Sequence, residues 1–128
     1  FKGNLGKEKF YKVSKDDLSD LEEGFKKNIK KAFLENTVTL INQPNNKAVK
    51  YIKDNTIRFL FIDGDHTAEG IAKDLDLFVN KLKKNAIIAF DDYANTFPGV
   101  IEVTNKFIKS HNINRKYLLG RTLFIQIN

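Results

Sequence analysis

The stretch Phe59-Leu60-Phe61-Ile62-Asp63-Gly64-Asp65-His66 has the form of a buried strand that ends abruptly in acids. A second stretch of the same form, Ile87-Ile88-Ala89-Phe90-Asp91-Asp92, follows later in the chain. Strands of a parallel sheet are buried on both faces and therefore have continuous apolar sequences. Ligands of such sheets bind in the crevice beyond the carboxyl ends of the strands. If the two strands are neighbours, their acids share one edge of the sheet, where a metal, a cofactor or a general base is expected.

Hydrophobic spacing around these strands predicts an alternation of helices and strands. Helices are expected over about 15–35 with Ser14 as N-cap, briefly after Pro44, over about 67–83, and from Pro98 onward. Strands are expected at 37–41, 57–62 and 86–90, and a terminal hairpin at 116–119 and 122–127. This order predicts an α/β fold with a Rossmann-like, mostly parallel sheet, helices on both faces and a C-terminal antiparallel hairpin. So few parallel strands make a thin sheet, which suggests that the first strands are missing.

Composition favours a single domain over residues 1–128. Eleven Phe supply a core, and the absence of Cys excludes disulfides and thiolate metal sites. The chain has no signal-peptide pattern and no run of the ~20 apolar residues that span a membrane. It also has no Met, even at position 1, so we expect an N-terminally truncated domain. We further expect a cytoplasmic location, no membrane partner, and a homo-oligomer as an open alternative to a monomer.

The net charge of +6 does not by itself indicate a nucleic-acid partner. Lysines late in the segment 15–35 follow acids early in it, which is the arrangement that the helix dipole favours on a solvated helix. No Arg-rich patch, zinc-finger spacing or aromatic-basic RNA motif accompanies them. We therefore expect a small-molecule partner and no nucleic acid.

The acids at the strand ends have a structural explanation and a functional one. An Asp after a strand is often an N-cap, so Asp65 or Thr67 could cap the helix over 67–83, and Asp92 could close a turn. Several carboxylates held together, however, disfavour one another's charged forms unless a cation or a proton offsets them. Hard cations such as Mg²⁺ prefer oxygen ligands of this kind.

Two segments together resemble a known family. The run Ile62-Asp63-Gly64-Asp65-His66-Thr67 and the segment 82–93 are similar to the C-terminal half of class I S-adenosylmethionine-dependent methyltransferases, nearest to the macrocin and sugar O-methyltransferases. The resemblance covers about residues 36–110 and implies that 37–41, 57–62 and 86–90 are the third, fourth and fifth strands of the family sheet. The glycine-rich loop that cradles the cofactor in the family is absent, and Asn85-Ala86 stands where Gly-Gly is common. By itself the chain would hold about half of a cofactor pocket.

The resemblance also implies roles for individual residues. It implies Mg²⁺ ligands at Asp63, Asp91 and Asp92, and S-adenosylmethionine contacts at Gln43, Asn45 and Asp63. It implies Asp65 as general base, and His66 is the other base candidate because its ordinary pKa lies nearest neutrality. The implied reaction is metal-assisted O-methylation of a small polyhydroxylated acceptor, in which the metal would lower the pKa of a hydroxyl and the base would take its proton.

Two other interpretations remain open. The run Asp63-Gly64-Asp65-His66-Thr67 resembles the Asp-x-Asp-x-Thr motif of haloacid-dehalogenase-type, Mg²⁺-dependent phosphatases, although that family places its motif on the first strand. The missing glycine loop also fits a non-catalytic, Rossmann-like interaction domain. Of the remaining residues, Tyr93 and Phe97 are expected to line the acceptor pocket, and His111 is expected to cap a helix C-terminus.

Overall fold

The computed structural model describes the backbone of residues 15–128 and the side chains from residue 19 onward, so the predicted N-cap Ser14 lies outside the described residues. In chain order the elements are α1 (Lys15–Lys31), α2 (Asn45–Ala48), the 3₁₀ helix η1 (Val49–Tyr51), β1 (Ile57–Ile62), α3 (Ala68–Phe78), the 3₁₀ helix η2 (Val79–Lys81), β2 (Leu82–Phe90), α4 (Pro98–Ser110), β3 (Arg115–Leu119) and β4 (Thr122–Gln126).

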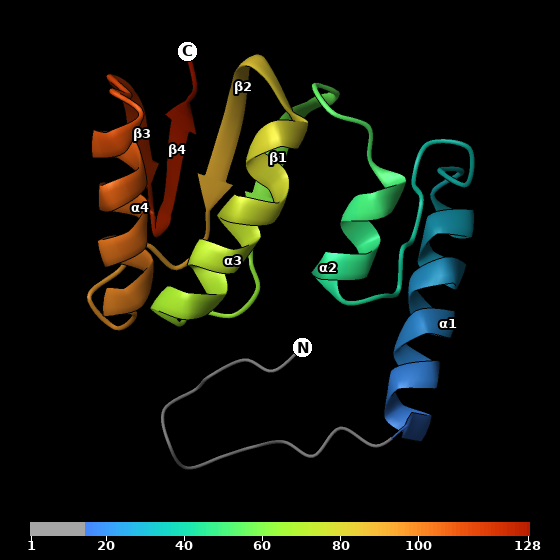
Figure 1. Cartoon of the computed structure of the whole chain (residues 1–128). Helices are drawn as coiled ribbons and strands as arrows, with labels where there is room; N and C mark the ends of the chain where they lie inside the picture. Colours follow the sequence, from blue (N-terminus) through green and yellow to red (C-terminus); the bar gives the residue numbers. More distant parts are fainter. Residues whose placement is uncertain (1–14) are drawn as a thin grey trace.

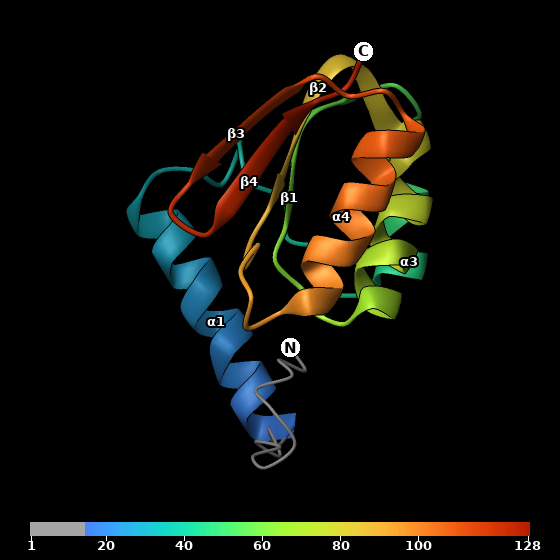
Figure 2. The same ribbon diagram turned by 90° about the vertical axis from the view of Figure 1, so that its left-hand side faces the viewer.

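The strands form one mixed sheet in the order β1-β2-β4-β3. Strands β1 and β2 are parallel, and the hairpin of β3 and β4 adds antiparallel to β2. Helices α3 and α4 lie on one face of this sheet, whereas α1 lies on the other side of it, beyond the β1 edge (Figure 1 and Figure 2). The predicted α/β fold class with a C-terminal antiparallel hairpin is therefore confirmed.

The hydrophobic core lies between the sheet and the two helices α3 and α4. Alternate strand residues point into this space, because side chains of a strand alternate between its two faces. The buried side chains come from both strands of the parallel pair, from the hairpin, from the helices and from the loop before β3: Ile62, Ile71, Leu75, Leu82, Ile88, Phe90, Val100, Phe107, Ile113, Leu123 and Ile125. This core fixes the ends of β1 and β2 relative to the starts of α3 and α4.

The opposite face of the sheet is largely uncovered. Phe59, Phe61 and Tyr117 keep 55%, 50% and 66% of their surface exposed. The strand register aligns Phe61, Ala89, Phe124 and Tyr117 in a single row across all strands. The described residues thus present one packed face and one apolar face that is exposed to solvent at β1 and β3 and covered at Ala89 of β2.

The predicted strand at 37–41 does not form. The carbonyl of Leu34 accepts the N–H groups of both Thr37 and Val38 at 2.9 Å, which bends the chain into turns directly after α1. No ladder pairs with the residues that follow, up to Ile41, in the described part of the chain. The β-branched composition of this segment was therefore not sufficient, because a strand also needs a neighbour to accept its hydrogen bonds.

Strand β2 begins at Leu82, four residues before the predicted start at Ala86, and α3 ends correspondingly early. Leu82 is buried in the core and pairs with Ile57, and then the register shifts before Phe59 pairs with Ile87. Asn85 lies within this irregular part and has a left-handed φ of 62°. Residues 83–86 lack the alternation of apolar and polar side chains that is typical of a strand, because a bulge interrupts the regular pairing of β1 and β2.

The starts of α3 and α4 lie against each other beside the strand ends. A Cβ on Gly99, in the first turn of α4, would lie 2.5 Å from the backbone nitrogen of Ala68 at the start of α3. At its other end, α4 stops at His111, whose Nδ1 lies 3.0 Å from the carbonyl oxygen of Phe107, as the predicted capping role requires. Among the described residues, none of the helices has the length and apolar character needed to cross a membrane.

Candidate active site at the carboxyl ends of the parallel strands

The predicted meeting of the two acid-tipped strands is confirmed. Ile62 and Phe90, the last residues of β1 and β2, are paired in the parallel ladder. The N–H of Asp91 then donates to the carbonyl of Ile62 at 3.0 Å, which extends the pairing one residue beyond the strands. The residues that follow β1 and those that follow β2 therefore emerge side by side at one edge of the sheet.

His66 and two of the acids form a group at this edge. Nε2 of His66 lies 3.2 Å from Oδ2 of Asp92 and 3.8 Å from Oδ1 of Asp63. The His66 side chain is only 13% exposed, and its ring centroid lies 4.6 Å from that of Phe97. The structure thus brings a histidine close to two carboxylates, although Nε2 of His66 makes no hydrogen bond among the described residues.

Arg121, which sequence reasoning did not find, completes this group. It lies in the turn between β3 and β4, and one guanidinium nitrogen lies 2.6 Å from Oδ1 of Asp92. The guanidinium carbon also lies 5.7 Å from the centre of the Phe97 ring. No local sequence signal marks Arg121, because its partner Asp92 lies in a different loop that only the sheet topology brings near.

The three predicted metal ligands do not converge on one point. Oδ1 of Asp92 is paired with Arg121, Oδ2 of Asp92 lies 3.2 Å from Nε2 of His66, and Oδ1 of Asp91 accepts the hydroxyl of Thr122 at 3.0 Å. Throughout the part of the chain with described side chains, no group of three or more His, Cys, Asp or Glu residues is arranged to hold a metal ion. The residues present therefore do not fit Mg²⁺, and the predicted role of this metal has no support here.

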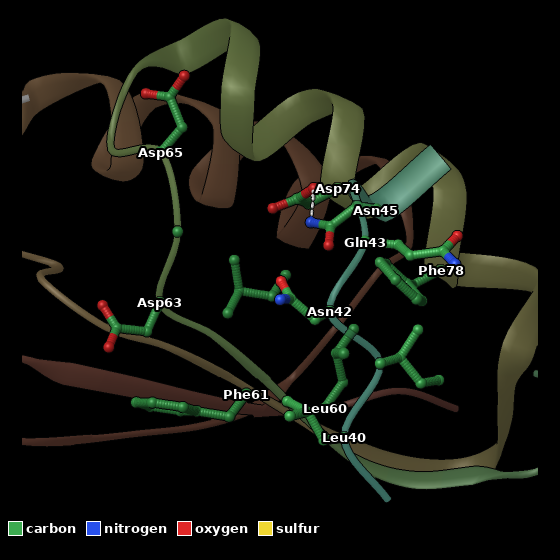
Figure 3. A pocket seen from close by; sticks show the side chains of 13 residues that line it. Leu40, Asn42, Gln43, Asn45, Leu60, Phe61, Asp63, Asp65, Asp74 and Phe78 are labelled. Atoms are coloured by element: carbon green, nitrogen blue, oxygen red, sulfur yellow. Dashed lines mark hydrogen bonds between the residues drawn. The ribbon is translucent and has the colours of Figure 1, made fainter. Parts of the chain in front are cut away.

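Asp65 lies apart from the His66 group. Its Oδ1 accepts the backbone N–H of Thr67 at 2.9 Å, and Thr67 in turn caps α3 by accepting the N–H of Gly70 at 3.1 Å. The carboxylates of Asp63 and Asp65 point in different directions from the turn that joins them (Figure 3). Asp65 is thus both a structural part of the turn before α3 and a polar group on the rim of the neighbouring pocket.

That pocket, of about 590 Å³, lies between β1 and the segment before α2. Figure 3 shows its apolar side chains, among them Leu40, Leu60 and Phe78, facing its polar ones. The three predicted cofactor contacts, Gln43, Asn45 and Asp63, all line it. The full lining is Leu40, Ile41, Asn42, Gln43, Asn45, Leu60, Phe61, Ile62, Asp63, Gly64, Asp65, Asp74 and Phe78.

Two further polar residues shape this pocket. Asp74 of α3 accepts the side-chain N–H of Asn45 at 2.7 Å, which ties α2 to α3 across the pocket (Figure 3). Asn42 donates to Glu22 of α1 at 2.7 Å and so connects the pocket wall to the first helix. The role of Asn42 could not be anticipated, since it depends on a contact between an irregular segment and a distant helix.

Comparison with known proteins assigns the chain to a family. Residues 4–93 match the family model described as a methyltransferase domain, Methyltransf_24. This chain belongs to that methyltransferase family. The match includes β1, β2 and the acids after both strands, so the site described above lies within the methyltransferase domain.

Two individual proteins are similar to this methyltransferase domain. Over 56 residues it is 38% identical to the uncharacterized protein R132 of Acanthamoeba polyphaga mimivirus, an alignment that covers 42% of this chain and 25% of the viral protein. A crystal structure of a protein from Corynebacterium glutamicum superposes with a TM-score of 0.67 at 10% sequence identity, covering 85% of this chain and 56% of that chain. The methyltransferase domain thus spans a quarter of one relative and little more than half of the other.

These findings decide between some of the sequence-based interpretations. The family match supports a methyltransferase and does not favour the phosphatase interpretation, in which Asp63 would attack a phosphoryl group. The likeness to the bacterial structure supports the fold. The finer resemblance to macrocin and sugar O-methyltransferases stays a prediction.

Proposed function

We propose that this methyltransferase domain transfers a methyl group from S-adenosylmethionine to an oxygen of a small polyhydroxylated acceptor. The observation that carries the proposal is the position of Asp63. Asp63 lines the pocket beside β1, and its carboxylate lies 3.8 Å from Nε2 of His66, so one residue borders both a cofactor-sized pocket and a candidate base.

The pocket has the chemistry that an adenosyl group requires. Leu40, Leu60 and Phe78 offer apolar surface for a flat base. The amides of Gln43 and Asn45 offer donors and acceptors for the base edge, and Asp63 offers a carboxylate for hydroxyl or ammonium donors. These residues fit S-adenosylmethionine, which when bound supplies an electrophilic methyl on a sulfonium.

The acceptor oxygen must lose its proton as its bond to the methyl carbon forms. His66 is one base candidate, which would take this proton on its imidazole ring; its buried Nε2 lies 3.2 Å from Oδ2 of Asp92 but makes no hydrogen bond among the described residues. Asp92 is then placed to stabilise the imidazolium that results. Asp65 is the other candidate, with one carboxylate oxygen held by the N–H of Thr67 and the other free of that bond.

Mg²⁺ has no assigned step in this mechanism, because among the residues with described side chains no group of three or more possible ligands is arranged to hold a metal ion. The small-molecule acceptor, the cytoplasmic location and the oligomeric state remain predictions. The macrocin and sugar O-methyltransferase branch also remains a prediction, because the sugar-type acceptor is implied by the resemblance alone.

The experiment measures binding and transfer separately in the full-length protein. Calorimetric titration with S-adenosylmethionine should show binding that Asp63→Asn weakens, while the exposed α3 variant Asp76→Asn binds as the wild type does. Transfer of a labelled methyl group to a panel of sugars and catechols should fall by about 10²-fold or more in His66→Gln if His66 is the base. The same fall in Asp65→Asn instead would assign the base to Asp65.

Two results would contradict the proposed cofactor site. If the full-length wild-type protein binds no S-adenosylmethionine, the pocket beside β1 is not the cofactor site. The same conclusion follows if the Asp63→Asn variant binds S-adenosylmethionine as tightly as the wild type does. Parallel assays with Mg²⁺ and with EDTA report whether transfer needs a divalent cation.

A further inference from the structure

We propose that Arg121 supplies the positive charge for Asp92, which follows β2, in place of a divalent cation, and that it positions Asp92 beside His66. The starting point is the disagreement described above: the acids lie where the family resemblance implies a metal, yet no group of three or more such residues is arranged to hold one in the described part of the chain, and Oδ1 of Asp92 is paired with Arg121. It concerns Arg121, a residue outside the segment that matches the family model.

Both the backbone and the side chain of Arg121 hold the loop that follows β2. Its carbonyl accepts the N–H of Tyr93 at 2.8 Å. Its guanidinium lies 2.6 Å from Asp92, 3.4 Å from the hydroxyl of Thr96, and over the ring of Phe97. The turn between β3 and β4 thus fixes three successive parts of the loop over 91–97.

Asp92 adopts a conformation that needs such support. Its φ of 52° lies in the left-handed region, which costs free energy for any residue with a Cβ, although Asp tolerates it better than most. One oxygen of its carboxylate faces Arg121 and the other faces His66. A strained backbone, together with the close contact from Arg121 to one carboxylate oxygen, indicates that the surroundings select one orientation of this carboxylate.

The geometry also explains why a guanidinium can take the place of a metal. Mg²⁺ demands near-octahedral oxygen ligands at short distances, whereas a guanidinium binds carboxylates through a planar fork and tolerates a mixed set of acceptors. With Arg121 at Asp92, a second cation at the same carboxylate would meet like-charge repulsion. The Arg121 side chain is 56% exposed, so the pair contributes little to global stability and its role is chiefly one of position.

The test probes cation binding directly with manganese chloride, which broadens NMR signals of nearby nuclei. In the wild type we expect no selective broadening of the backbone amides of Asp63 and Asp92. In Arg121→Met, which keeps an apolar stem but no charge, the same amides should broaden, with an affinity for Mn²⁺ at least about tenfold higher. Arg121→Lys, which restores a charge, should behave like the wild type.

Arg115→Met is the matched control. Arg115 begins β3 in the same hairpin, and its guanidinium donates to the side-chain oxygen of Gln126 at 2.8 Å. This variant should leave the Mn²⁺ response unchanged. The proposal is overturned if wild type and Arg121→Met bind Mn²⁺ equally at these amides, and equally if neither binds it.

A second experiment rests on the proposed function and tests whether Arg121 positions Asp92 for catalysis. In EDTA, Arg121→Met should lose about 10- to 100-fold in kcat, because Asp92 no longer orients His66, with little change in the KM for S-adenosylmethionine. Added Mg²⁺ should restore part of this loss in Arg121→Met and have no effect on the wild type. A fall in cofactor affinity without a fall in kcat would contradict the positioning role. If the wild type transfers no methyl group at all, the proposed function fails while the Mn²⁺ result still decides the role of Arg121.

Discussion

Replacing Gly70 by alanine should destabilise the domain, although the same change inside an exposed helix usually stabilises it. Gly70 lies in the first turn of α3, and the Asp65 side chain lies directly over it. An added Cβ would lie 2.5 Å from Cβ of Asp65, 2.6 Å from its Cγ and 2.9 Å from its carbonyl oxygen. Real Cβ atoms do not tolerate such distances, so the turn carrying Asp65 must move.

The expected change in the free energy of unfolding is the sum of one stabilising and two destabilising contributions. Alanine gains about 1 kcal/mol over glycine in helix propensity. Overpacking against a backbone costs about 1–3 kcal/mol. Displacing Asp65 also loses its 2.9 Å hydrogen bond from Thr67, worth about 1 kcal/mol. The net expectation is a loss of about 1–3 kcal/mol in the free energy of unfolding.

Urea unfolding followed by circular dichroism measures this change as a lower midpoint with an unchanged slope. The matched control is Gly24→Ala in α1, where an added Cβ meets nothing within 4 Å. There we expect increased helix content and a gain of about 0.5–1 kcal/mol in the stability of that helix. If Gly70→Ala also stabilises the protein, Asp65 does not lie over α3 and the assigned turn is wrong. The double variant Asp65→Gly/Gly70→Ala should recover the part of the loss that comes from overlap with the Asp65 side chain, but not the part that comes from the hydrogen bond to Thr67.

Three further changes test packing, capping and surface charge. Ile88→Ala removes a fully buried side chain and should cost about 2–5 kcal/mol, whereas Phe59→Ala on the exposed face should cost under about 1 kcal/mol; coinciding urea midpoints would contradict the assigned faces. Thr67→Ala should cost about 1 kcal/mol because the Thr67 hydroxyl accepts a backbone N–H of the first turn of α3, and a fully stable variant would refute this cap. The hydrogen bond from Lys106 lowers the pKa of Glu102, so its stabilising effect is present above the pKa of the unfolded chain and is lost as the pH falls through the folded value. A carbon-13 NMR titration should show a higher pKa of Glu102 in Lys106→Met. An unchanged pKa would contradict the assigned ion pair between Glu102 and Lys106.

The strand-end acids were predictable because their signals are local. The apolar runs before Asp63 and Asp91 mark buried strands by themselves, and parallel pairing then brings their carboxyl ends to one edge. The hairpin was predictable for the same reason, since Gly120-Arg121 interrupts two apolar segments. Local pattern and final structure agree wherever the pattern needs no knowledge of a distant partner.

The remaining features depend on distant partners. The segment 37–41 has the composition of a strand but lies in turns and irregular backbone, because no neighbouring strand pairs with it in the described residues. The early start of β2 follows from the burial of Leu82 against other elements rather than from its neighbours in sequence. The pairing of Asp92 with Arg121 likewise arises only when the hairpin adds to β2, so a sequence reading assigned Asp92 to a metal.

The apolar face of the sheet that α3 and α4 leave open also determines how the domain behaves at high concentration. Among the described residues, β1 is an edge strand of the sheet, and Phe59 and Phe61 add exposed apolar side chains to that edge. A flat, apolar margin of this kind promotes self-association and aggregation. Placing a charge on this edge, as in Phe59→Lys, should therefore raise the solubility of the domain without disturbing the buried side chains. Such a variant would give samples concentrated enough for the NMR experiments above.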